Sequence, residues 1–283
     1  MTKSSGTSYV ISIFKRSRRV TIGVLIFCAL VIFSLIGAVA PGNPRDPTPM
    51  AYQPPSLQNI FGTDALGRDV FAQTLQGAWY SLKIGVIAGF ISTLIGVAIG
   101  GLGGYFGGVI DEATSASTNV IMTIPTLALL FVIASYMKIR SEWFIILLIS
   151  IMSWAWTARA IRVQVLTLKT REFIDIAKES GLSKIRILVF EVLPNMLAYI
   201  VMSFATLVGG SIIAEASLAA IGLGPSAVIS LGIMLRWAIS FQAASTGVWW
   251  WILPPGILIT LYSLSLLLIK DGLDEIFNPR TRK

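Results

Sequence analysis

The sequence predicts an all-α polytopic membrane protein with six transmembrane helices, five in a core and one appended at the N-terminus. Of the 283 residues, 55% are hydrophobic and only 13% are charged, too few charges to cover the surface of a soluble domain of this length. The formal net charge is +8, but the basic residues flank long apolar runs. That placement indicates a membrane topology, with lipid and not nucleic acid as the surrounding partner.

Each transmembrane helix is predicted from an apolar window. A helix needs about 20 mainly apolar residues to cross the bilayer hydrocarbon. Six windows approach this length: residues 20–40, 84–104, 118–137, 143–158, 196–219 and 247–269. The fourth is short, so we expect its helix to continue toward Val165. The first is interpreted as a retained anchor and not as a signal peptide, because its apolar core is too long and Pro41 would follow the cleavage site.

Prolines separate the first window from the others. Six of the twelve prolines fall between Pro41 and Pro55, which predicts an extended linker and not a helix. The predicted organisation is a tail at 1–19, a first transmembrane helix at 20–40, an extracytoplasmic linker at 41–80 and a five-helix domain at 81–283, with its large charged loop at 159–195.

The basic residues also predict an orientation. With the N-terminus inside, 16 of the 22 lysines and arginines lie in inner segments and 6 in outer ones. The positive-inside rule therefore places both termini and the loop 159–195 in the cytoplasm of a multi-pass cell-membrane protein.

Several classes of chemistry are disfavoured by what the sequence lacks. It has no histidine and one cysteine, Cys28, which argues against His-ligated metal, His-based catalysis and an intrachain disulfide. The glycine-rich run 100–108 lacks the Lys-Ser/Thr of a phosphate loop and is better explained by close helix packing and a tight turn. We expect a protein that is not an enzyme and does not hydrolyse nucleotide itself.

The most informative stretch is 172–195, which carries charge of both signs between apolar runs. It predicts two short helices, with Gly181 in a positive-φ position after the first and Ser183 capping the second. The first helix is amphipathic, which fits an interfacial helix lying on lipid. It also fits docking into a groove on a cytosolic protein, with Phe173 and Ile174 as anchors.

Ordered motifs in this stretch and beyond it resemble a known family. The loop reads Asp175-Ile176-Ala177, then Gly181, then Leu193-Pro194-Asn195, similar to the Glu-Ala-Ala loop of ABC importer permeases. Further landmarks of the dipeptide, oligopeptide and nickel permeases of the C type are present at 61–69, 104–108, 111–112, 124–126, 215–218, 222–224, 271–273 and 278–280. Two departures, Asp175-Ile176 for Glu-Ala and Glu191 for the usual histidine, both lie in the docking loop.

The resemblance implies a five-helix type I importer core within a multi-subunit transporter. A second homologous permease subunit, two cytosolic ATPases that bind ATP and Mg, and an extracytoplasmic substrate-binding protein would complete it. No cofactor would be bound by this chain. Cargo would be peptides or oligosaccharides, with nickel disfavoured because metal ligands are scarce. ATPase coupling is assigned to one set of residues: Glu172, Phe173, Ile174, Asp175, Ala177, Gly181 and Leu182.

Other candidate residues lie in or beside the windows. Glu215 is an acid well inside a predicted span, so it is a candidate for the pathway or a subunit interface, with a structural hydrogen bond as the alternative. Pro125 is expected to kink the third span, and it is likewise a candidate for the pathway or a subunit interface.

Outside the membrane, Asp64, Arg68 and Asp69 are expected to form a local salt-bridge cluster that shapes the surface meeting the binding protein. Residues 230–235 predict a short external helix. The tryptophans at 249–251 predict an interfacial belt, and Pro254-Pro255 a kink in the last span.

The competing hypothesis is a secondary transporter or channel acting alone. That class is typified by internal repeats and several buried ionisable groups, whereas we find no convincing repeat and only Glu215.

Overall fold

The computed structural model describes residues 17–40, 43–47, 50–138 and 140–277. Most of the predicted tail, Pro41 and the motif at 278–280 lie outside these ranges. In the described part the regular structure is helical, with two isolated β-bridges in the segment that follows the first helix. The helices are α2 (Arg18–Val39), α3 (Val70–Phe106), α4 (Gly108–Thr123), α5 (Thr126–Tyr136), α6 (Glu142–Ser153), α7 (Ala155–Leu168), α8 (Glu172–Glu179), α9 (Lys184–Ile187), a π-helical turn (Leu188–Val192), α10 (Leu193–Asn195), α11 (Leu197–Ala220), α12 (Leu231–Ser240) and α13 (Trp249–Phe277).

The helices agree with the predicted count of membrane spans. Four of those described, α2, α3, α11 and α13, are each long and apolar enough to cross a bilayer. The pairs α4–α5 and α6–α7 bend by 80° and 44° at short breaks, and counting each pair as one span gives six. The all-α polytopic fold is therefore confirmed.

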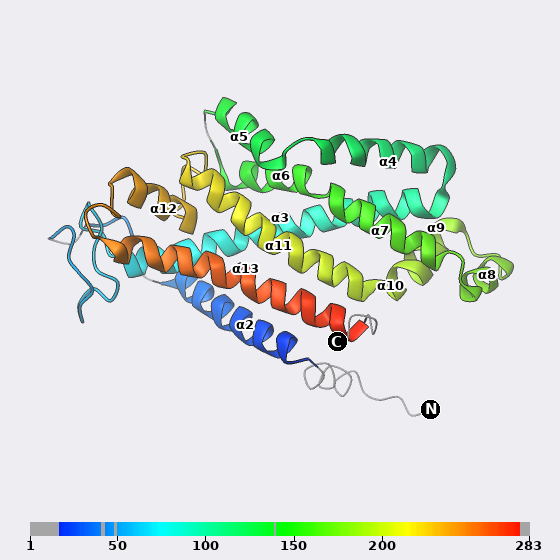
Figure 1. Cartoon of the computed structure of the whole chain (residues 1–283), viewed down its shortest axis with the longest axis horizontal. Coiled ribbons are helices and arrows are strands. Elements are labelled where there is room, and N and C mark those ends of the chain that lie inside the picture. The colour runs from blue at the N-terminus through cyan, green and yellow to red at the C-terminus, as the bar shows by residue number, and fades with distance from the viewer. Residues whose placement is uncertain (1–16, 41–42, 48–49, 139, 278–283) are drawn as a thin grey trace.

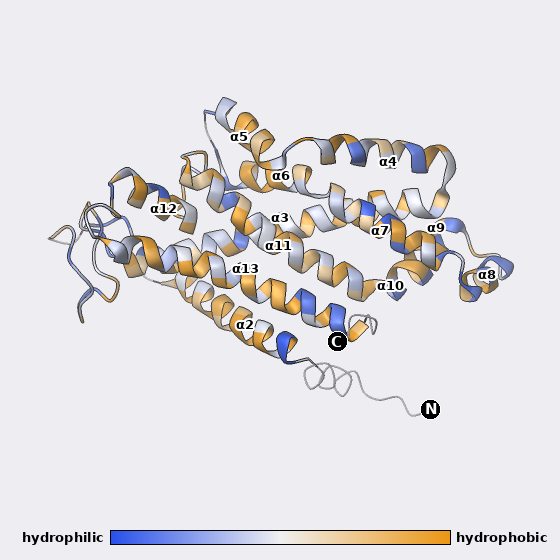
Figure 2. Cartoon of the chain, in the orientation of Figure 1, coloured by the Kyte–Doolittle hydropathy of each residue, from blue (hydrophilic) through white to orange (hydrophobic). Residues whose placement is uncertain are grey.

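The bundle is elongated, with α3 at its centre (Figure 1). Helix α3 packs against α2, α7 and α11, and α13 packs against both α2 and α11. Helix α12 lies at one end of the long axis and α8 at the other, and these are called here the α12 end and the α8 end. Apolar residues dominate the long helices, whereas polar residues gather toward the two ends (Figure 2).

Glycines allow the long helices to approach one another closely. A Cβ atom on Gly100 would overlap the carbonyl of Ala158, and one on Gly104 would lie 2.8 Å from the carbonyl oxygen of Arg162. Both contacts join α3 to α7. Gly107 and Gly108 then turn the chain into α4 with φ of +70° and +56°. The packing and turn predicted for the glycine-rich run are thus confirmed.

One element boundary differs from prediction. Helix α3 begins at Val70, so residues 70–80, predicted as linker, are helical. The reason is that Asp69 caps the helix by accepting hydrogen bonds from the N–H groups of Phe71 and Ala72. Helix α13 runs on through Pro254 and Pro255 without ending. Because proline has no N–H group, the helix lacks the hydrogen bonds that residues 254 and 255 would otherwise donate to the carbonyls of Trp250 and Trp251.

Candidate functional site

A helical hairpin, residues 172–195, projects from the α8 end of the bundle (Figure 1). Gly181 follows α8 with φ +75°, and the Leu182 N–H donates to the carbonyl of Ala177 at 3.3 Å. Ser183 Oγ accepts a hydrogen bond from the Arg186 N–H at 3.4 Å, which caps α9. The predicted cap and glycine turn are confirmed. The second helix differs from prediction, because a π-helical turn separates α9 from α10.

One face of this hairpin is packed against the bundle. Ile174 is 0% exposed and lies in a buried apolar cluster with Tyr105, Ile161 and Val165 from α3 and α7. Phe173 and Leu182 are partly buried against the same cluster, whereas Ala177 is part of it. The predicted role of Ile174 as an anchor for a partner is not compatible with this burial. Its side chain instead attaches α8 to its own chain.

Other apolar side chains of the hairpin are exposed, and the sequence did not predict a docking role for them. Ile176 and Ile185 are each 63% exposed and Phe190 is 68% exposed. Glu172 and Asp175 are exposed beside them. Lys178 Nζ donates to Asp175 Oδ1 at 2.8 Å, and this hydrogen bond raises the pKa of the lysine. The hairpin therefore offers a surface of apolar residues with charges of both signs around them. We call Ile176, Ile185 and Phe190 the apolar face.

The hairpin is braced where it joins the bundle. Lys169 Nζ donates to the carbonyl oxygens of Gly104 and Tyr105 at 3.3 and 3.4 Å. About two turns earlier, in α7, Arg162 forms a bidentate ion pair with Asp111 of α4, with Nη2 and Oδ2 2.7 Å apart. These contacts tie the chain that leads into the hairpin to α3 and α4.

Replacing Gly181 with valine is expected to destabilise the hairpin by about 1–3 kcal/mol, the usual cost of holding a non-glycine residue in strained backbone. No atom lies within 4 Å of an added Cβ, so backbone strain is the only cause. Gly181→Asn is the matched control, because asparagine tolerates positive φ. Amide exchange of residues 172–187 measures the difference. Equal protection in the two variants would contradict the role assigned to Gly181.

A cavity of about 740 Å³ opens between α5, α6, α7, α11 and α13. Seven residues with hydroxyl groups are spread over a largely apolar lining, and they are Thr126, Ser153, Thr157, Tyr199, Ser203, Thr206 and Ser211. Lys270 and Asp274 of α13 are its charged lining residues. The sequence analysis missed this site. On α11 its signal was a stripe of small and polar residues, at 203, 206, 210 and 211, in an apolar helix.

Glu215 does not line this cavity. It is 0% exposed, and its Oε2 accepts a hydrogen bond of 3.0 Å from the Ser81 hydroxyl of α3. The Ser81 hydroxyl also accepts a hydrogen bond of 3.1 Å from the backbone N–H of Leu231, at the start of α12. Glu215 therefore helps to hold α12 on α3 and α11. Of the two roles left open by the sequence, the structural hydrogen bond fits this geometry, and the pathway or subunit-interface role does not.

Pro125 lies, as predicted, at a break, here the 80° bend between α4 and α5. Its own side chain is exposed, and the following residue, Thr126, is the first to line the cavity.

The predicted salt-bridge cluster near the start of α3 is real but smaller than expected. Asp64 is fully buried and accepts from Arg68 Nε at 2.7 Å and from Gln73 Nε2 at 2.9 Å. The Arg68 guanidinium also stacks on the Trp237 ring of α12, 4.2 Å from its centroid. Asp69 has a different role from the one predicted, because it caps α3.

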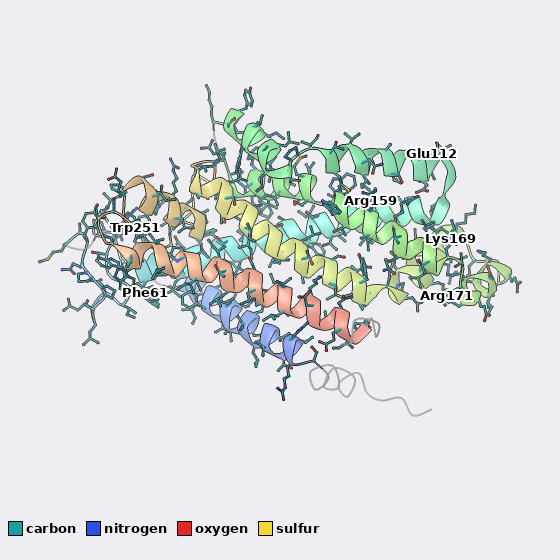
Figure 3. All side chains as sticks on the ribbon, in the orientation of Figure 1. Phe61, Glu112, Arg159, Lys169, Arg171 and Trp251 are labelled. Atoms are coloured by element: carbon teal, nitrogen blue, oxygen red, sulfur yellow. The ribbon has the colours of Figure 1, made fainter. Side chains whose placement is uncertain are left out.

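The tryptophan belt is only partly as predicted. Trp249 is exposed, but Trp251 is fully buried beside α12 (Figure 3), and Trp250 donates its indole N–H to the carbonyl of Thr63 at 3.2 Å.

In the part of the chain that the structure describes, no group of three or more His, Cys, Asp or Glu side chains could hold a metal ion.

Comparisons with known proteins agree on the class. Residues 92–283 match the family described as binding-protein-dependent transport system inner membrane component. The chain is 32% identical to the dipeptide transport system permease protein DppC of Bacillus subtilis over 272 residues, which are 95% of this chain and 84% of DppC. It is also 32% identical to the oligopeptide transport system permease protein OppC of Mycobacterium bovis over 232 residues, 81% of this chain and 79% of OppC.

A solved structure of the inward-facing MetNI methionine ABC transporter shares the fold. The match has a TM-score of 0.55 at 21% identity and covers 74% of this chain and 97% of the MetNI chain. The resemblance seen in the motifs is thereby confirmed. The chain belongs to the family of binding-protein-dependent transport system inner membrane components, as a permease subunit of an ABC importer.

Proposed function

We propose that this permease subunit forms one side of a translocation pathway for peptides, with the 740 Å³ cavity as its part of that pathway. The proposal rests on this cavity and on the residues that line it. Its hydroxyl groups can exchange hydrogen bonds with main-chain amides, which every peptide has, without selecting particular side chains. The names of the relatives DppC and OppC support peptides as cargo, and a lining without His or Cys gives nickel no soft ligands.

We further propose that the apolar face of the hairpin docks onto a cytosolic ATPase subunit. Short amphipathic helices commonly bind by inserting apolar side chains into a groove. Ile176, Ile185 and Phe190 are exposed, while Ile174 and Ile187 on the inner side hold the hairpin to the bundle. A push on the hairpin can then move α3, α4 and α7 as a rigid body. The ATPases would bind the ATP and Mg, and this placement puts the hairpin and both termini in the cytoplasm.

The complete transporter in this proposal contains a second permease subunit, two ATPases and an extracytoplasmic binding protein. The segment near Asp64, Arg68 and Trp237, at the α12 end, would shape the surface that receives the binding protein. The test is reconstitution in proteoliposomes. Peptide uptake should require the permease pair, the ATPases, ATP and the binding protein together. Uptake by this chain alone would overturn the proposal in favour of a stand-alone transporter or channel.

Replacing Gly210 with leucine is expected to reduce peptide uptake strongly without weakening the fold. Gly210 lines the cavity, and no atom lies within 4 Å of an added Cβ, so the new side chain would occupy open space. Leucine is also a better helix former than glycine by nearly 1 kcal/mol. Gly256→Leu is the matched control, since Gly256 of α13 is equally open but lies outside the cavity. Equal uptake by the two variants would show that cargo does not pass Gly210.

A further inference from the structure

A second cavity, of about 230 Å³, lies between α3, α4 and α7. It shares no lining residue with the translocation cavity. Its polar lining residues are Thr114, Ser115, Thr118 and Asn119 of α4 with Arg159 and Arg162 of α7. The volume is several times the roughly 30 Å³ of one water molecule, so the cavity can hold a polar group of several heavy atoms.

The cavity carries an unneutralised positive charge. Arg162 is paired with Asp111 through two hydrogen bonds. Arg159 is exposed and has no ion pair among the residues that the structure describes, and its Nη1 lies 3.8 Å from the sulfur of Met122. Figure 3 places Arg159 on α7, facing α4. A guanidinium with five N–H donors in a polar cavity is a ready partner for an anion with several oxygens.

The remaining polar groups identify which donors are free. The hydroxyls of Thr114 and Thr118 already donate within α4, to the carbonyls of Asp111 and Thr114, and the Ser115 hydroxyl donates to Asp111 Oδ1 at 3.5 Å. Asn119 has no hydrogen bond among the described side chains and lines the cavity together with Arg159. The free donors are thus one guanidinium and one amide, a set that suits phosphate oxygens.

The height of the cavity in the bundle matches a lipid headgroup. Helix α3 has 37 residues and is therefore about 55 Å long, against roughly 30 Å of bilayer hydrocarbon. A centred α3 extends about 12 Å beyond the hydrocarbon at each end. Gly100, which packs on Ala158 next to Arg159, lies six residues, or about 9 Å, from the end of α3 at Phe106. Arg159 directly follows the apolar window 143–158, so it lies near the α8-side end of its span, where a long basic side chain can reach the headgroups.

An exposed apolar side chain lies next to the lining of the cavity. Val120, which follows Asn119, is 61% exposed. Apolar side chains of this kind border acyl chains at membrane interfaces. Basic pockets between transmembrane helices on the cytoplasmic side are suited to anionic headgroups, because anionic lipids are enriched in that leaflet.

We infer that the cavity between α3, α4 and α7 binds the phosphate of an anionic phospholipid, with Arg159 and Asn119 as its donors. The lipid would fill the space between α4 and α7 and supply the negative charge that the described residues do not provide for Arg159. This binding does not depend on the cargo or on the hairpin, so its test is separate from that of the proposed function.

The test uses the assembled transporter, purified in detergent and freed of lipid, then titrated with phosphatidylglycerol and analysed by native mass spectrometry. Arg159→Gln is expected to weaken lipid binding about fivefold to tenfold, in line with roughly 1 kcal/mol or more for one basic residue near anionic lipid. Arg19→Gln is the matched control, because Arg19 is an exposed arginine at the start of α2 and lies outside the cavity. Arg19→Gln should weaken phosphatidylglycerol binding less than Arg159→Gln does, because Arg19 attracts anionic lipid only as a surface charge.

A second variant changes the cavity without removing the arginine. Asn119→Asp introduces a carboxylate that can pair with Arg159, so it should lower phosphatidylglycerol binding as strongly as Arg159→Gln does, with no loss of assembly. Phosphatidylcholine, which has a phosphate but no net charge, should bind more weakly than phosphatidylglycerol.

Three outcomes would overturn the inference. The first is equal binding of phosphatidylglycerol by Arg159→Gln and Arg19→Gln. The second is binding of inorganic phosphate with no binding of lipid, which would assign the cavity to a free anion. The third is a lipid-free assembled transporter that takes up no phosphatidylglycerol at all, which would indicate that a partner subunit fills the space.

Discussion

Replacing Asp64 with alanine is expected to lower the free energy of unfolding by about 3–5 kcal/mol, the usual cost of leaving one member of a buried ion pair alone. The carboxylate accepts from the side chain and backbone N–H of Arg68, at 2.7 and 2.9 Å, and from Gln73 at 2.9 Å. Without it, the Arg68 guanidinium stays buried, and its Nη2 already lacks a partner among the described residues. The stacking on Trp237 cannot replace a carboxylate.

The matched control is Asp69→Ala, five residues away. Asp69 is partly exposed and caps α3, so its loss should cost only about 1 kcal/mol. Equilibrium unfolding in mixed detergent micelles, followed by tryptophan fluorescence, compares the two variants. Equal losses for Asp64→Ala and Asp69→Ala would show that the buried pair does not hold the α12 end together.

The spans were predictable because apolar length is a local property of the sequence. Helix α11, Leu197–Ala220, differs by one residue at each end from the window 196–219. Helix α3 was predicted too short for a physical reason. Its first turns carry Gln73 and Thr74, which look unsuited to a membrane helix but are buried, with Gln73 Nε2 donating to Asp64 and the Thr74 hydroxyl donating to the carbonyl of Val70.

The site was less predictable because burial depends on residues distant in the sequence. Ile174 and Ile176 are equally apolar, and only the packing of α8 beside Tyr105 and Ile161 decides that the first is buried and the second exposed. The translocation cavity could not be derived from any single window, since it needs five helices together. The family motifs predicted where the hairpin lies in the chain but not which of its faces is free.

Replacing Ile176 with aspartate is expected to weaken binding of the ATPase subunit about 30-fold, the effect of losing roughly 2 kcal/mol at an interface hot spot. Peptide uptake should fall with it, because the hairpin would no longer transmit ATPase movement. The side chain is 63% exposed and makes no part of the buried cluster, so the fold should be unchanged. Binding of purified ATPase to the immobilised permease measures the effect.

Two controls separate docking from folding. Val109→Asp makes a similar change at an exposed residue of the α8 end, outside the hairpin, and should leave ATPase binding intact. Ile174→Val removes one buried methylene and should lower the free energy of unfolding by about 0.5–1.5 kcal/mol. It should leave ATPase binding near its original value. Ile174 and Ile176 lie on opposite faces of α8. The proposed docking therefore predicts that Ile176→Asp lowers ATPase binding but not stability, and that Ile174→Val lowers stability but not ATPase binding. Equal ATPase binding by Ile176→Asp and Val109→Asp would show that the apolar face is not the docking surface.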